Sequence, residues 1–426
     1  MRRTVAAINE RIQNGDAVVM TALEVQDLID QGGRRELEEV DVVTTGTMGL
    51  MSGIYGLFSF PVAPPGAHMR FVEASIMGIP LHLGPCTNER LGLIEGMVFG
   101  TSKSRDHPDY GAGHLFRDLV EREEVTVEAI SDAGEKVLSS VTLGEMGTAR
   151  LLSTRAAFRN YRAFVNPSPA PVRTIFSSRP LPGRSGGLTF SGCGSLNPLE
   201  SDPRLRTVGV GTRLLFNGAV GYVMASGTRS TPANPNLMAV AEMKGMSPSY
   251  LGGFLTSAGP ECIASFALPI PVLDEEVMAG LGRRDRDLSL PVADITDRRV
   301  VGTASYGEAW EGRDLQIEVR PDRCKGCREC AVESACPTRA MRRENGPVLD
   351  RERCFNCGTC VKLCPGGAFV GDLGSVDIIT EGDSRRVPVV CRQSNRWGAL
   401  RAAEDLKARI QRSEFLLTSK VADLHP

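Results

Sequence analysis

The chain has 426 residues, of which 42% are hydrophobic, so it can bury a large core, and we expect two or more domains. Its formal net charge is -2 and only 5% of its residues are aromatic, which argues against binding to nucleic acid or to an anionic membrane surface. The N-terminus carries early charges instead of an apolar signal segment, and no apolar run reaches the ~20 residues that a membrane span needs. We therefore expect a cytoplasmic protein.

The N-terminal region alternates helix and strand patterns. Residues 4–14 have helical apolar spacing and stop at Gly15, and residues 18–20 form a short strand pattern. Thr21 and Glu24 then form a capping box for a second helix. The next strand pattern, at residues 40–43, runs into the small residues 44–49, which we interpret as a loop at the end of a strand, where α/β folds place ligand sites.

The middle of the chain, residues 45–260, is rich in glycine, proline and small polar residues. No segment there matches a dinucleotide-binding fingerprint or a P-loop. Cys86, Cys193 and Cys262 lie in three loops of similar character, each with glycine or proline beside it. A single buried cysteine is most simply a small core residue. Together, however, the three suggest either a third [4Fe–4S] cluster with one open iron or a persulfide-forming nucleophile.

Residues 275–315 are charged and are interpreted as a connector, and eight of the twelve cysteines follow it. The second of two cysteine runs has the C-x2-C-x2-C-x3-C-P spacing of bacterial ferredoxins, and the first has two extra residues before its last cysteine. Because the two halves of such modules exchange their fourth ligand, we expect two [4Fe–4S] clusters. One would be held by Cys324, Cys327, Cys330 and Cys364, and the other by Cys354, Cys357, Cys360 and Cys336.

Paired C-x-x-C units also bind zinc, but zinc does not explain eight cysteines with a proline after both fourth positions. A strand pattern at 376–379 and a helix pattern at 397–410 follow, and Cys391 between them is interpreted as structural. We divide the chain into a mixed α/β catalytic domain (1–315), an α+β ferredoxin-like module (316–372) and a small C-terminal extension (373–426).

The first 310 residues resemble the homocysteine biosynthesis domain family, and most closely its methanogenesis marker protein 16 branch. The resemblance is carried by Val42-Val43-Thr44-Thr45-Gly46-Thr47, Gly111-Ala112-Gly113-His114 with Asp118-Leu119-Val120, Asn160-Tyr161 with Val165-Asn166, Leu196-Asn197-Pro198-Leu199, Arg206 to Arg213, Met246-Ser247-Pro248 and Pro269 to Leu273. The family implies sulfur transfer that turns an aldehyde into a thiol. The branch implies the last step of coenzyme M biosynthesis, from sulfoacetaldehyde to 2-mercaptoethanesulfonate, in the cytoplasm of an anaerobe.

Homocysteine-forming members carry one cysteine after the Thr-Thr-Gly-Thr stretch and another after the Asp-Leu-Val helix. This chain has neither: residues 48–53 read Met-Gly-Leu-Met-Ser-Gly and residues 131–134 read Ser-Asp-Ala-Gly. The departure argues against a homocysteine enzyme that uses the same residues. Aspartate semialdehyde nevertheless stays an alternative substrate, and an electron carrier or assembly factor of a redox complex is an alternative of another class.

Reduction of an aldehyde and sulfide to a thiol consumes two electrons, which a fused two-cluster module can deliver one at a time. The reaction also implies a sulfide or persulfide donor, an external electron donor and a small anionic aldehyde. Arg206, Arg213 and Arg229 are candidates to bind a sulfonate, since guanidinium groups match its oxygens. His114 is the candidate acid–base residue and Asn197 a candidate to orient substrate, although either could simply cap a local element.

Overall fold

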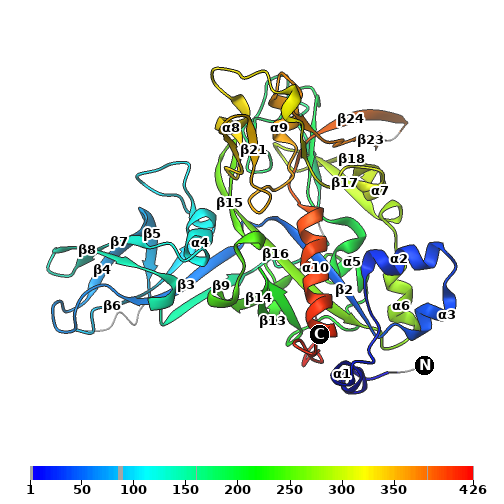
Figure 1. The fold of residues 1–426 in the computed structure, drawn as a ribbon, viewed down its shortest axis with the longest axis horizontal. Coiled ribbons are helices and arrows are strands. Elements are labelled where there is room, and N and C mark those ends of the chain that lie inside the picture. The colour runs from blue at the N-terminus through cyan, green and yellow to red at the C-terminus, as the bar shows by residue number, and fades with distance from the viewer. Residues whose placement is uncertain (1–2, 85–89, 160, 381, 426) are drawn as a thin grey trace.

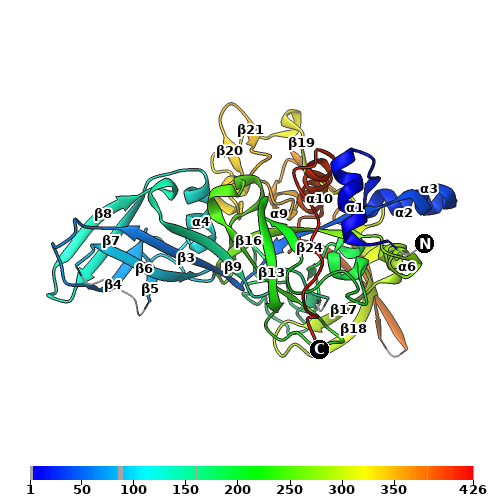
Figure 2. The same ribbon diagram turned by 90° about the horizontal axis from the view of Figure 1, so that it is seen from below.

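The computed structural model describes residues 3–84, 90–159, 161–380 and 382–425. The fold is mixed α/β, as expected, and its described residues form one long sheet of 14 strands and one closed six-stranded barrel. Figure 1 shows the cysteine-rich module, with helices α8 and α9, above the middle of the long sheet, while the strands around β4 and β7 extend away as an arm. Figure 2 shows the same arm from below.

The long sheet runs in the order β1-β2-β16-β12-β13-β14-β9-β3-β6-β5-β4-β7-β8, and β15 pairs with β16. Its strands are β1 (Val19–Thr21), β2 (Val42–Leu50), β3 (Ile54–Pro61), β4 (Phe71–Ile76), β5 (Ile79–Leu83), β6 (Leu93–Phe99), β7 (Val125–Ser131), β8 (Lys136–Val141), β9 (Thr148–Ser153), β12 (Arg213–Phe216), β13 (Ala219–Ser226), β14 (Leu237–Glu242), β15 (Gly252–Thr256) and β16 (Gly259–Pro271). Among the pairings of the long sheet given for the described residues, β1 with β2 is parallel and the others are antiparallel.

The barrel closes in the order β10-β11-β24-β23-β18-β17. Its strands are β10 (Ala163–Val165), β11 (Leu188–Phe190), β17 (Ser289–Asp294), β18 (Val300–Ser305), β23 (Ser375–Thr380) and β24 (Asp383–Arg392), and the cysteine-rich module adds β19 (Glu318–Val319), β20 (Met341–Arg343), β21 (Pro347–Leu349) and β22 (Phe369–Val370). The helices are α1 (Val5–Asn14), α2 (Ala22–Asp30), α3 (Arg34–Glu39), α4 (Ala112–Val120), α5 (Pro198–Ser201), α6 (Glu275–Leu281), α7 (Tyr306–Trp310), α8 (Ala331–Ala335), α9 (Thr359–Leu363) and α10 (Arg396–Gln411). Short 3-10 turns are η1 (Leu143–Glu145), η2 (Gly194–Leu196), η3 (Met243–Gly245), η4 (Pro248–Tyr250), η5 (Asp285–Asp287) and η6 (Pro321–Arg323).

The helices predicted near the two ends of the chain are present, and their capping residues explain where they begin and end. Helix α1 ends at Gly15, whose φ of 78° is the left-handed conformation that glycine adopts without strain. The Thr21 hydroxyl accepts a hydrogen bond from the Glu24 backbone amide, and the Glu24 carboxylate accepts one from the Thr21 backbone amide, so the predicted capping box starts α2. Helix α10 covers the helical pattern predicted near the C-terminus.

The prediction of a loop at residues 44–49 is wrong, because these residues belong to the buried strand β2. A Cβ atom at Gly46 would lie 2.2 Å from the Ala399 carbonyl oxygen of α10, so this glycine lets a helix approach the strand closely. The small residues therefore reflect packing under α10 and not a turn.

Two further parts of the predicted organisation differ from the structure. Residues 373–426, expected as a separate extension, supply barrel strands β23 and β24 and the helix α10 that packs on β2 and β16. Residues 275–315, expected as a connector, supply β17 and β18. These strands are short and only half buried, so apolar and polar residues do not alternate along them in the way that would predict a strand.

Candidate functional site

The eight clustered cysteines line two cavities. Cys324, Cys327, Cys330 and Cys364 surround one cavity, and Cys336, Cys354, Cys357 and Cys360 surround the other. Each set takes three cysteines from one run and the last cysteine from the other run. Val332, Met341 and Phe369 line both cavities, so the two sites share an apolar wall.

The donors of each cavity fit an iron–sulfur cluster. The described cysteines are all free thiols, and four sulfur donors inside apolar walls are the ligand set of a [4Fe–4S] cube. Within the described ranges, no three Cys, His, Asp or Glu side chains are grouped so that they could hold a single metal ion. A four-iron cube is larger than one ion and needs more widely spaced ligands.

The cavity of Cys336, which we call the inner cavity, packs against the large domain. The rings of Phe355 and Phe254 meet edge to face at 5.2 Å, and the Leu255 amide donates to the Pro337 carbonyl at 2.8 Å. Phe254 and Leu255 belong to β15, and Gly253 of the same strand pairs directly with Cys262 on β16. The inner cavity is therefore separated from Cys262 by a single strand.

A ninth cysteine adjoins the inner cavity, and the sequence analysis missed it. Cys391 on β24 is buried, and its thiol is hydrogen-bonded to that of Cys357. The Ser178 hydroxyl lies 4.0 Å from the Cys391 sulfur. Cys391 lies 27 residues beyond Cys364 in the sequence, and only closure of the barrel brings it to the module, so no spacing pattern could have found it.

Cys193 lies at the start of η2 in a fully buried polar group. Its thiol donates to the Met48 carbonyl at 3.7 Å and accepts from the Thr47 hydroxyl at 3.9 Å, while Thr47 lies 3.2 Å from the Tyr161 hydroxyl. Burial raises the pKa of both Cys193 and Tyr161. Both groups are therefore protonated at neutral pH, and Tyr161 is a potential proton donor.

The loop around Cys193 is fixed by a buried ion pair. Asp285 and Arg396 lie 2.6 Å apart with side-chain exposures of 8% and 6%, and the Ser195 amide donates to Asp285 at 2.7 Å. A Cβ atom at Gly194 would lie 2.0 Å from an Asp285 oxygen, so only glycine fits there. The ion pair and the close contact at Gly194 therefore hold the loop around Cys193 in one conformation.

Cys262 lies in a different environment from Cys193, and no hydrogen bond joins the two among the described residues. Burial raises the pKa of the Cys262 thiol and raises that of its neighbour Glu261 to about 7. Glu261 contacts Ser52. Cys86, the third cysteine of the predicted group, lies outside the described residues, so convergence of the three stays a prediction.

His114 lies in the first turn of α4, as its sequence position predicts. The Gly111 amide donates to Nδ1 at 3.1 Å, so the proton of the neutral imidazole is on Nε2. Burial, followed by the positive charge of Arg339, lowers the pKa of His114 to about 4. The ring rests on β15, where a Cβ atom at Gly253 would lie 2.2 Å from Nδ1. Gly253 and Cys262 are directly opposite, so His114 and the Cys262 side chain share one face of the hairpin.

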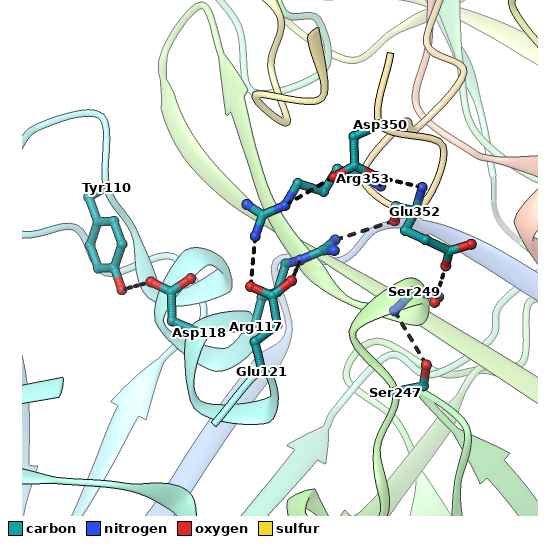
Figure 3. Close-up of polar contacts among 9 residues, drawn as sticks. All are labelled: Tyr110, Arg117, Asp118, Glu121, Ser247, Ser249, Asp350, Glu352 and Arg353. Carbon is teal, nitrogen blue, oxygen red and sulfur yellow. Dashed lines mark hydrogen bonds and ion pairs between the residues drawn. The ribbon is translucent and has the colours of Figure 1, made fainter. Parts of the chain in front are cut away.

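A polar network joins α4 to the cysteine-rich module (Figure 3). Glu121 accepts from Arg117 at 2.8 Å and from Arg353 of the module at 2.7 Å. Glu352 binds the hydroxyl of Ser249 from the large domain. These contacts hold the module in one orientation beside His114.

The predicted anion-binding arginines are not assembled into one site. Arg206 pairs with Asp274 and Glu276, each at 2.6 Å, and Arg213 donates to the Leu416 carbonyl and lies over Phe415. Arg229 is exposed in a turn with a φ of 61°. Asn197 caps α5 and donates to the Phe158 carbonyl, which accounts for its conformation without a substrate.

Residues 17–417 match the family described as homocysteine biosynthesis enzyme, sulfur-incorporation. This chain belongs to that family. It is 45% identical, over 97% of this chain and 94% of the relative, to an uncharacterized protein of Methanothermobacter thermautotrophicus. It is 31% identical to the L-aspartate semialdehyde sulfurtransferase of Methanosarcina acetivorans, over 75% of this chain and 64% of that enzyme.

Sixty residues of the chain are 36% identical to an uncharacterized ferredoxin of Methanocaldococcus jannaschii, covering 14% of this chain and 40% of the ferredoxin. No solved structure matches the chain. In the described parts of the protein, no helix is both long and apolar enough to cross a membrane.

Proposed function

We propose that this protein transfers sulfur reductively to a small anionic aldehyde, sulfoacetaldehyde being the first candidate, and forms the corresponding thiol. The observation that carries the proposal is the contact between the inner cavity and β15, which puts a four-cysteine site one strand away from Cys262. The family membership supports sulfur transfer, and the ferredoxin similarity supports iron–sulfur clusters in the module.

The proposed reaction consumes one sulfide, two electrons and two protons for each aldehyde and releases one water. Sulfide adds to the aldehyde carbon and gives a thiohemiacetal, loss of water gives a thioaldehyde, and two electrons with two protons give the thiol. Clusters held by the two sets of four cysteines would supply those electrons one at a time from an external donor. The Nε2–H of His114 would hold the substrate by a hydrogen bond. If the sulfur comes from a persulfide donor, Cys262, with Cys193 as the second candidate, would accept the outer sulfur as a persulfide. Two further electrons and two protons would then release it as hydrogen sulfide and restore the thiol.

The test uses anaerobically purified full-length protein, reduced with dithionite and freed of excess reductant. Addition of sulfide and sulfoacetaldehyde should oxidise the protein, seen as a rise in absorbance near 400 nm, and should yield 2-mercaptoethanesulfonate by mass spectrometry. Omission of either substrate is the control. Electron loss that does not depend on the aldehyde would contradict the proposal and favour a role as electron carrier.

Aspartate semialdehyde is a second candidate substrate, because relatives that share 28% and 31% identity with this chain are named L-aspartate semialdehyde sulfurtransferase. The missing cysteines after residues 44–47 and after α4 count against it. Competition between the two aldehydes in one reaction, with both thiols quantified, decides between them.

A further inference from the structure

We propose that the cavity between α4, β15 and the cysteine-rich module binds the anionic head group of the aldehyde, with Arg339, Arg353 and the Nε2–H of His114 as its donors. The inference rests on the proposed function and deepens it, because it gives the substrate a place and replaces the arginines predicted from the sequence.

The cavity is built by three separate parts of the chain. The residues that line it and carry the argument are His114 and Arg117 on α4, Gly252 and Gly253 on β15, and Arg339 and Arg353 on the module. A Cβ atom at Gly253 would meet the His114 ring, so this glycine lets the ring pack against the strand, whereas a Cβ atom at Gly252 would make only an ordinary contact with Arg117. Because the module supplies one wall, the site exists only when the module is docked as Figure 3 shows.

The charged groups of the cavity favour an anion. Arg117 and Arg353 share the single carboxylate of Glu121, and Arg353 also lies 3.6 Å from Asp350. Arg339 is exposed and lines the cavity, and its side chain forms no ion pair or hydrogen bond with any residue that the structure describes. A planar guanidinium with free donors is suited to sulfonate or carboxylate oxygens.

Among the described residues that line the cavity, the three arginines outnumber the acidic side chains. Asp118 is the one acidic side chain among the described lining residues, and the Tyr110 hydroxyl donates to it at 2.6 Å. Burial raises the pKa of Asp118. His114 is neutral, since burial and the charges of Arg339 and Arg353 lower its pKa. An anion bound in the cavity would neutralise the positive charges of Arg339 and Arg353 that act on His114.

His114 provides a second, independent sign of a ligand. Its Nδ1 accepts from the Gly111 backbone, so Nε2 must carry the proton, and this buried N–H has no hydrogen-bond partner in the described part of the chain. Unpaired buried donors are rare in proteins because each costs the free energy of a lost hydrogen bond. An oxygen of the ligand in the cavity would satisfy it.

The position of the cavity agrees with the chemistry. Ile263, which lines it, follows Cys262, and Arg353 precedes Cys354 of the inner cavity. A two-carbon aldehyde anchored here by its charged end is beside both the thiol-bearing hairpin and the module.

The test measures binding of sulfoacetate, a stable anion that cannot be reduced to the thiol, to the cluster-loaded full-length protein by anaerobic calorimetry. Arg339→Gln should weaken binding by about tenfold or more, and Arg339→Lys should restore part of the loss. The matched control is Arg342→Gln, an exposed arginine three residues away on β20 that does not line the cavity, which should leave affinity within about twofold.

His114→Asn tests the imidazole donor, because asparagine can still accept from the Gly111 amide but lacks the Nε2–H; it should also weaken binding. Iron content and absorbance of each variant show that the module is intact. L-aspartate, whose ammonium group the arginines would repel, should bind more weakly than sulfoacetate. Tighter binding of L-aspartate would mean that an amino acid aldehyde, and not a sulfonate, is the occupant, and would overturn the assignment of the sulfonate to this cavity.

Absence of sulfoacetate binding to the wild-type protein, or equal affinity of Arg339→Gln and Arg342→Gln, would overturn the inference. The two proposals fail separately. If Arg339→Gln forms thiol with an unchanged KM, only the cavity assignment is wrong. If sulfoacetate binds through Arg339 but the wild-type protein forms no thiol from any aldehyde, the cavity stands and the proposed function is wrong.

Discussion

The close contact between His114 and β15 predicts that Gly253→Ala disables the protein. An added Cβ atom would lie 2.2 Å from Nδ1 of the ring and 2.3 Å from two ring carbons, whereas ordinary contact begins at 3.4 Å. The ring must therefore move by about 1.2 Å. Overpacking of this kind costs ~1–3 kcal/mol of stability.

The larger effect should be on turnover. A displacement of about 1 Å of a group that acts on the substrate lowers the rate by ~100-fold. We therefore expect Gly253→Ala to lower kcat/KM by roughly that factor while the iron content stays unchanged, since no cysteine is touched. The assay is aldehyde-dependent thiol formation, with iron analysis of the same sample.

The neighbouring glycine supplies the control. A Cβ atom at Gly252 would lie 3.5 Å from Cδ of Arg117, which is an ordinary contact, so Gly252→Ala should retain most of the activity. If Gly253→Ala were as active as Gly252→Ala and bound sulfoacetate equally well, the placement of His114 against β15 would have no functional meaning.

Three further outcomes follow from the structure. Cys336→Ser should remove the cluster held by Cys354, Cys357 and Cys360 and leave the cluster held by Cys324, Cys327 and Cys330 intact, as seen by electron paramagnetic resonance. Loss of the Cys324 cluster instead would contradict the exchange of ligands. Cys391→Ala should keep the iron but lower the potential of the same cluster, since it removes a hydrogen bond to the sulfur of Cys357, and an unchanged potential in a redox titration would refute this. Because burial raises the pKa of Glu261 to about 7, the folded protein loses stability as pH rises from about 4.5 to 7. Glu261→Gln should therefore stabilise the protein by up to ~3 kcal/mol at pH 8 and not at pH 4, as compared by urea unfolding.

Local signals in the sequence were enough where a few neighbouring residues decide the outcome. The helix caps at Thr21 and Gly15 act within one turn, so their patterns predict the ends of α1 and α2. The cysteine spacing likewise predicts two sets of four, because three cysteines in one tight turn can surround only part of a cube. The position of His114 in the first turn of a helix was likewise predicted from the sequence, while its role stays a prediction.

Sequence patterns failed where distant segments meet. The small residues after Val43 looked like a loop because the pattern cannot show that α10 lies on Gly46. Arg206 and Arg213 looked available for a ligand because their partners, Glu276 and Leu416, are far away in the chain.

The sequence by itself thus determined the family, the mixed α/β class, the ferredoxin-like module and the grouping of its cysteines, all of which depend on local spacing or on long motifs. Only the tertiary structure decided that Cys391 reaches Cys357 and that Arg339 lines the same cavity as His114. Those contacts join residues more than 30 and 200 positions apart, and they form because the barrel closes through β24 and the module docks on α4 and β15. Long-range contacts of this kind depend on the packing of whole elements, which no local pattern records.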